Sequence, residues 1–164
     1  MKARFISECY ADTALLDFLL KDFQRCTHQN CIGDVANEMK SYLDDSEAVL
    51  VGVVDQDKSS VPKYFRQFEE KSYTDGVRFK KHPAHEQYLI ALDPPLERFL
   101  LKAASAVNIT LSEFGLPDEL KEFIKETKNP NIGDSVYFRG LIEKLILLES
   151  PSILALQEII RGFL

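Results

Sequence analysis

Acidic side chains follow two predicted strands of this 164-residue sequence, with a spacing that suits metal-ion chemistry. Glu8 and Asp12 are four residues apart, and Asp55 and Asp57 come directly after the apolar run Ala48–Val54. Because ligands bind outside the carboxyl ends of strands in an open parallel sheet, we expect these four carboxylates to meet in one crevice. Like charges at close range raise one another's pKa, and a cation relieves the repulsion. Carboxylate oxygens without His or Cys select magnesium or manganese.

The same acids also suit ordinary structural roles. Asp12 is a favourable N-cap for the helix that follows the first strand, and Thr13 beside it is another. An Asp-x-Asp pair by itself often does no more than solvate a turn. The combination favours a metal site, because Glu8 with Asp12 follows one predicted strand while Asp55 with Asp57 follows a buried one.

Further side chains extend the predicted site. Asp93 comes directly after the apolar strand Tyr88–Leu92 and Glu97 lies just beyond it, at the point where a third strand would open into the same crevice. Lys58 follows Asp57 and is placed to neutralise a phosphate in the transition state of phosphodiester cleavage. A solvated loop lysine explains Lys58 equally well.

The elements that must position these residues alternate between strand and helix before residue 95. The apolar run 48–54 is typical of a central strand covered on both faces. We expect further strands over 1–8, 77–80 and 88–92, a poorly defined strand within 25–31, and helices over 12–23, 32–43 and 62–70. Beyond residue 95 the pattern predicts helices only, over 96–107, 117–127, 134–148 and 152–164.

This order predicts an α/β fold, with a mostly parallel, Rossmann-like sheet flanked by helices and an all-helical cap at the C-terminal end. We expect residues 1–95 to form the α/β core and residues 96–164 to form a helical extension packed on it, as one compact domain. The apolar faces of the last two helices are explained by this core, and they would also suit a homodimer.

The charge of the chain limits how it can meet a nucleic acid. With 26 acidic and 20 basic residues the formal net charge is −6, whereas a broad nucleic-acid-binding face is usually basic. A polyanion would therefore need metal ions or a local basic patch. The stretch Arg78–His82, together with Lys71, is the best such patch, and Phe79 could stack on a base. A solvated edge strand explains this stretch equally well.

The cysteines and the apolar segments indicate a compartment. Cys9, Cys26 and Cys31 are an odd and sparse set, which favours reduced thiols. Cys26, His28 and Cys31 have the spacing of half a zinc knuckle, but the sequence has no second Cys/His pair to complete it, so we expect no zinc site. No apolar run approaches the ~18 residues of a membrane span, and the start lacks a signal peptide, so we expect a cytoplasmic protein without membrane contact.

The arrangement of the acids resembles the TOPRIM domain, whose first strand ends in Glu-Gly-x-x-Asp and whose later strand ends in Asp-x-Asp. Here Glu8-Cys-Tyr-Ala-Asp12 keeps the spacing of the first motif, and Asp55-Gln-Asp57 matches the second. The match covers residues 1–95 at the level of element order. Cys9 takes the place of the usual glycine, whose missing side chain lets the backbone approach a ligand. A cysteine there narrows the site.

The resemblance implies roles for individual residues. Glu8 would be the general acid/base, Asp55 and Asp57 would bind magnesium or manganese, and Asp12 would support either role. The chain looks most like the small stand-alone TOPRIM proteins akin to the nuclease half of the overcoming-lysogenization-defect (OLD) family, which are bacterial. Several of these carry a further acid in a Pro-x-Leu-Glu-like context, which implies that Glu97 is a second metal ligand, with Glu86 as a weaker rival.

Three functions follow as expectations. The first is a metal-dependent, TOPRIM-type nuclease that acts on DNA or RNA. The second is a non-catalytic module with the same fold that works beside an ATPase or a phage-defence protein, which the negative charge and Cys9 favour. The third is a nucleotide-binding domain of flavodoxin-like class, which the lack of a Gly-rich phosphate loop in the sequence disfavours.

Overall fold

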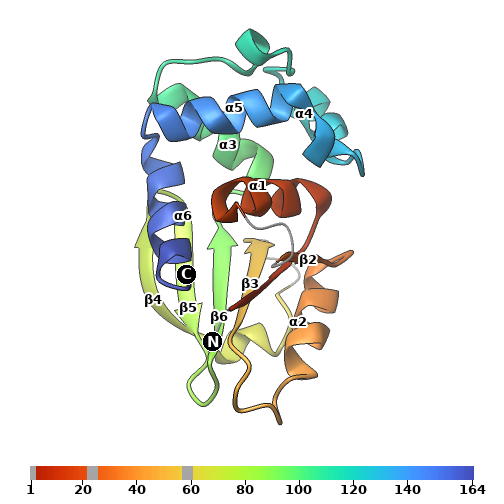
Figure 1. Ribbon diagram of the computed structural model, residues 1–164, viewed down its shortest axis with the longest axis vertical. Helices are drawn as coiled ribbons and strands as arrows, with labels where there is room; N and C mark the ends of the chain where they lie inside the picture. The colour runs from red at the N-terminus through yellow and green to blue at the C-terminus, as the bar shows by residue number, and fades with distance from the viewer. Residues whose placement is uncertain (1–2, 22–25, 57–60) are drawn as a thin grey trace.

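The chain is an α/β protein with one six-stranded sheet, seen in the computed structural model (Figure 1), which describes residues 3–21, 26–56 and 61–164. The strand order is β2-β1-β3-β6-β5-β4. The strands are β1 (Arg4–Ser7), β2 (Cys26–His28), β3 (Leu50–Asp55), β4 (Glu69–Thr74), β5 (Val77–Lys81) and β6 (Gln87–Leu92). The α-helices are α1 (Tyr10–Leu20), α2 (Ile32–Lys40), α3 (Leu96–Ala106), α4 (Leu120–Thr127), α5 (Val136–Leu147) and α6 (Pro151–Arg161).

The four strands β2, β1, β3 and β6 are parallel, and β3 lies between β1 and β6. The central position of β3 confirms the prediction from its apolar run, because successive residues of β3 enter the cores on opposite faces of the sheet. In this register Ser7 pairs with Val53, and Asp55 pairs with Leu92. The carboxyl ends of β1, β3 and β6 therefore lie side by side at one end of the sheet.

The segment 62–70, which the sequence analysis predicts to be a helix, forms instead the 3-10 turn η1 (Phe65–Gln67) followed by strand β4. Its apolar residues do face one way, but Tyr64, Phe65 and Phe68 pack as an aromatic cluster around the buried His82. β4 then forms an antiparallel hairpin with β5. The two-residue turn 75–76 has positive φ at both positions, which an Asp-Gly pair adopts readily.

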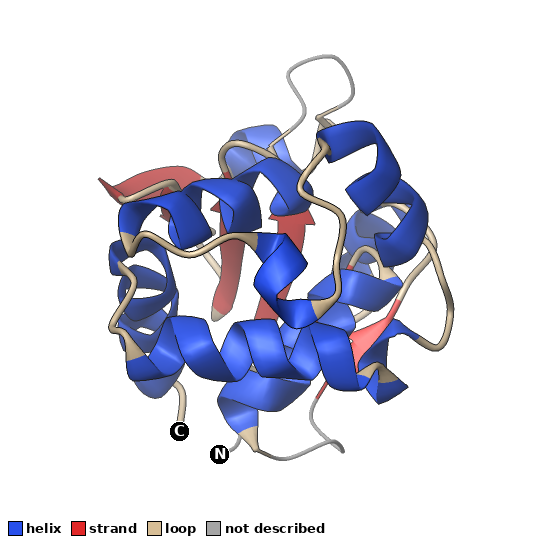
Figure 2. Ribbon diagram, turned by 90° about the horizontal axis from the view of Figure 1, so that it is seen from above, coloured by secondary structure: helices blue, strands red, loops and turns tan. Residues whose placement is uncertain are grey.

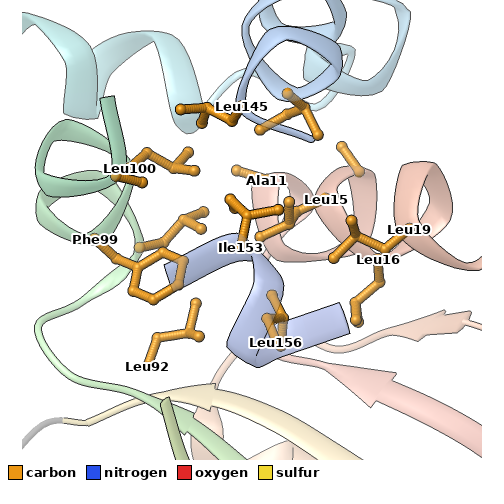
Figure 3. Packing of buried hydrophobic residues seen from close by; sticks show 14 of the residues in the cluster. Ala11, Leu15, Leu16, Leu19, Leu92, Phe99, Leu100, Leu145, Ile153 and Leu156 are labelled. Atoms are coloured by element: carbon orange, nitrogen blue, oxygen red, sulfur yellow. The ribbon is translucent and has the colours of Figure 1, made fainter. Parts of the chain in front are cut away.

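Two apolar cores sandwich the sheet. Helix α2 and the aromatic cluster cover one face, and α1, α3 and α6 cover the other, with α5 packed on α1 and α6. Figure 3 shows Leu15 of α1, Phe99 of α3 and Leu156 of α6 gathered near Leu92 of β6. Burying each such side chain contributes about 2 kcal/mol.

α4 and α5 lie beyond the end of the sheet at which the parallel strands stop, whereas α6 runs back alongside the sheet and contacts β5 (Figure 1 and Figure 2). The 3-10 turns η2 (Leu111–Phe114) and η3 (Ile132–Asp134) connect α3, α4 and α5, and the described residues 96–164 contain no strand, as predicted. Phe138, Leu141 and Ile153 belong to the same core cluster as Phe5 of β1. Among the described residues, no helix is long and apolar enough to cross a membrane.

Gly52 of β3 is a test of how tightly α2 packs on the sheet. A Cβ atom at this position would lie 2.8 Å from Met39 Sδ, 3.1 Å from Leu89 Cδ1 and 3.3 Å from Val35 Cγ1. We expect Gly52→Val to lower the free energy of unfolding by about 2 kcal/mol, measured by urea denaturation, because the buried neighbours must move apart. Gly133→Ala is the control, since its nearest neighbour would lie at 3.7 Å. Equal stability of the two variants would contradict this packing.

Candidate active site

The site begins where β1 and β3 end side by side. The backbone N–H of Glu8 donates to Val53 O at 3.2 Å, which extends the parallel pairing one residue beyond β1. The Glu8 carboxylate turns back and accepts the backbone N–H of Asp55 at 3.1 Å. Two acids that are 47 residues apart in the chain are therefore in direct contact. The structure brings Glu8 and Asp55 together, as the sequence predicts.

Asp55 connects the sheet to the helical cap. Its Oδ1 accepts the backbone N–H of Leu96, the first residue of α3, at 2.8 Å. The N-cap residue Pro95 makes no side-chain capping bond, so Asp55 satisfies an N–H that α3 itself leaves open. This anchoring places Glu97, one residue further on, at the same site. The Glu97 carboxylate in turn accepts the Thr127 hydroxyl of α4 at 2.5 Å.

These acids line one pocket with a volume of about 270 Å³. Glu8, Asp55 and Glu97 contribute its acidic wall. The remaining lining residues come from the start of α1, the end of β2 and the end of α4: Cys9, Tyr10, His28, Asn30, Thr127 and Lys128. The pocket therefore combines carboxylates with two aromatic rings and one ammonium group.

Asp12 lies buried beside the pocket, with 1% of its surface exposed. Its Oδ2 accepts the Cys9 thiol at 3.1 Å, and its Oδ1 has no hydrogen-bond partner among the described residues. Burial raises the pKa of Asp12 well above its ordinary value, and the charges of Asp55, Glu8 and Glu97 raise it further. The charges of the three pocket acids therefore all act on Asp12.

Cys9 is the N-cap of α1, which corrects the prediction that Asp12 or Thr13 caps this helix. The Cys9 Sγ accepts the backbone N–H of Asp12 at 3.4 Å, and this bond places the Asp12 side chain inside the first turn. Burial raises the pKa of the Cys9 thiol, and the charge of Asp12 raises it further. The thiol is therefore protonated and can donate to Asp12. Cys9 has an extended backbone (φ −138°), which any residue can adopt, so a cysteine at this position causes no backbone strain.

Other predicted residues lie elsewhere. Asp57 and Lys58 are outside the described residues. Asp93 forms an ion pair with Arg78 at 2.9 Å and does not line the pocket. The prediction of Glu86 as the alternative metal ligand is wrong, because Glu86 precedes β6, at the opposite end of that strand, and pairs with Lys81.

The predicted cationic patch on 78–82 is also wrong. Its strand, β5, is not an edge strand but lies between β6 and β4. Arg78 pairs with Glu70 as well as with Asp93, and His82 is 5% exposed inside the aromatic cluster. Phe79 is stacked against Tyr88, with ring centroids 5.7 Å apart, and does not present itself to a base.

The sequence analysis missed the aromatic part of the pocket. Tyr10 and His28 stack with their centroids 4.2 Å apart and their planes at 17°. Tyr10 carries no motif, and His28 drew notice only as part of a half zinc knuckle. Their meeting depends on β2 pairing with β1 so that Ser7 lies beside His28, and the weak pattern of residues 25–31 does not fix that register.

Within residues 3–21, 26–56 and 61–164, no group of three or more His, Cys, Asp or Glu side chains is arranged to hold a metal ion. The chemistry of the acids nevertheless fits a hard cation, because Asp12 has an unsatisfied buried oxygen and lies among negative charges. Comparison with protein-family models, with curated proteins and with solved structures gives no match to this chain.

The raised pKa of Asp12 predicts a stability that depends on pH. The folded protein holds this proton more tightly than the unfolded chain, so the stabilisation is full below the ordinary Asp pKa of about 3.9 and is lost as pH rises through the folded-state pKa. Asp12→Asn cannot ionise. In EDTA at pH 8 we expect it to unfold a few degrees above the wild type, and the difference to shrink as the pH approaches 4.

Thermal unfolding followed by circular dichroism measures this difference. Asp44→Asn, which changes an exposed acid outside the pocket, is the control and should leave the midpoint unchanged. If Asp12→Asn is less stable than the wild type at pH 8, Asp12 is ionised and stabilised in the folded protein, contrary to our interpretation.

Proposed function

We propose that this chain carries out magnesium- or manganese-dependent phosphodiester chemistry on nucleic acid, in the manner of a TOPRIM-type nuclease. The observation that supports the proposal most is the convergence of Glu8, Asp55 and Glu97, which come from three distant segments and line one pocket. The pocket lies outside the carboxyl ends of parallel strands, where α/β proteins bind their ligands.

The acids would hold the metal. Among the described residues, the proposed metal ligands are Glu8, Asp55 and Glu97. Asp57 is expected to be a further ligand, and Asp12 would support them from inside the fold. Backbone N–H groups already orient Glu8 and Asp55, as hydrogen bonds commonly do for metal-ligating carboxylates. A bound magnesium ion would supply Lewis-acid stabilisation of the phosphoryl oxygens.

Glu8 is the proposed general base. Its carboxylate is held by the Asp55 N–H at the wall of the pocket, where it would take a proton from the attacking water. Lys128 lines the same pocket and would offset part of the phosphate charge, and Lys58 is expected to do so as well. The net charge of −6 makes these local cations necessary.

One observation favours the second candidate function, a non-catalytic module that binds an ATPase or a phage-defence protein. Each described acid of the pocket makes a hydrogen bond that joins two elements: Glu8 joins β1 to β3, Asp55 joins β3 to α3, and Glu97 joins α3 to α4. These bonds would keep the acids useful to the fold even in a chain without activity.

Calorimetric titration with magnesium and manganese separates the two functions. Asp55→Asn keeps an oxygen for the Leu96 N–H but removes the charge, so we expect it to weaken metal binding at least tenfold. Asp44→Asn, an acid outside the pocket, should bind as the wild type does. If the wild type and Asp55→Asn bind metal equally, the site is not at Asp55.

A cleavage assay with manganese tests catalysis on plasmid, single-stranded DNA and RNA. Glu8→Gln keeps an acceptor for the Asp55 N–H but cannot take a proton, so we expect the rate to fall by about 100-fold or more. The exposed acid Glu143 on α5 provides the control, Glu143→Gln. Cleavage by Glu8→Gln at the wild-type rate rules out Glu8 as the base. A wild type that neither cleaves nor binds metal supports the interaction module.

A further inference from the structure

A stacked pair of aromatic rings forms one side of the acidic pocket. Tyr10 is the first residue of α1, and His28 is the last residue of β2. Their ring centroids are 4.2 Å apart and their planes are at 17°, and both residues line the pocket together with Glu8 and Asp55. Tyr10 is 39% exposed although one ring face is covered by His28. Part of Tyr10 therefore remains accessible from the solvent.

The His28 ring lies beside the Thr13 hydroxyl. The Thr13 hydroxyl lies 3.5 Å from His28 Nδ1 and is also within hydrogen-bond distance of Cys9 O at 2.8 Å and of the Ser7 hydroxyl at 2.6 Å. His28 Nε2 is buried and has no hydrogen-bond partner among the described residues. The imidazole stacks on Tyr10 and supports its ring.

The rest of the pocket suits a nucleotide. Asn30 offers an amide that can both donate to and accept from a base edge, and Lys128 offers a positive charge for a phosphate. Every nucleobase has a face that can stack on an aromatic ring, and in a duplex that face is already covered by neighbouring bases. Only an unpaired base can use such a ring.

We propose that the Tyr10–His28 pair is a stacking platform for one unpaired nucleobase, and that the substrate is therefore single-stranded nucleic acid. This inference rests on the proposed function, because the phosphate next to the stacked base would lie at Glu8 and Asp55. Tyr10 makes the contact with the base, and His28 is a positioning residue. The platform supplies sequence-independent affinity that the acidic wall of the pocket cannot.

Fluorescence anisotropy with a labelled single strand of ~10 nucleotides measures the contact. All variants keep Glu8, which the proposal also uses as a metal ligand, and calcium replaces magnesium so that binding is observed without cleavage. We expect Tyr10→Ala to weaken binding about tenfold, the loss of one stacked base, and Tyr10→Phe to keep the affinity. Tyr137→Ala, an exposed tyrosine on α5 outside the pocket, is the matched control and should bind normally.

A second probe is the same oligonucleotide with its bases removed, which retains the phosphates. The chain carrying Tyr10 should prefer the complete strand about tenfold, and Tyr10→Ala should bind both probes alike. Lys128→Ala should weaken both probes equally and lower the slope of affinity against salt by about 1, which Tyr10→Ala should leave unchanged.

The outcomes separate this inference from the proposed function. Metal-dependent binding or cleavage that is the same for Tyr10→Ala, and the same for complete and base-free strands, overturns the platform but keeps the nuclease. Preference for a duplex over the single strand also overturns the platform. If no oligonucleotide binds and the calorimetric titration shows no metal at Asp55, both proposals are overturned.

Discussion

Repulsion between carboxylates is the constraint on which the rest of this structure depends. The parallel pairing of β1 with β3 brings Glu8 against Asp55, and the start of α3 adds Glu97. Backbone N–H groups offset part of this repulsion by donating hydrogen bonds to Glu8 and Asp55. Asp12 is buried, and its pKa rises as a result. The concentration of negative charge that remains is the physical reason to look for a cation.

Much of this arrangement is predictable from the sequence. An apolar run without alternation indicates a central parallel strand, and β3 takes that position. The acids that follow β1 and β3, and Glu97 after β6, then have to gather at one edge of the sheet. The four helices expected beyond residue 95 are present within a few residues of their predicted bounds, because their apolar stripes are strong.

Most of the wrong or missing predictions depend on contacts between distant segments. The aromatic spacing of 62–70 fits a helix. In the structure these rings pack against His82, and the residues that follow them form β4. The Asp-Gly pair at 75–76 was a local signal for that hairpin. The prediction that Asp12 or Thr13 caps α1 fails for a local reason, because Asp and Thr are common caps whereas here the Cys9 thiol fills that role. The Tyr10–His28 stack has no local signal.

The edges of the sheet limit how this chain can associate with others. The outermost described strands are β2, which has three residues, and β4, whose six residues are all exposed. β4 begins with Glu69, Glu70 and Lys71, and such a row of charges is a poor template for an incoming strand. Main-chain extension of the sheet into a second molecule is therefore disfavoured at both sides. Assembly would have to rely on side-chain surfaces, such as the exposed Leu147 and Leu164 at the ends of the last two helical segments.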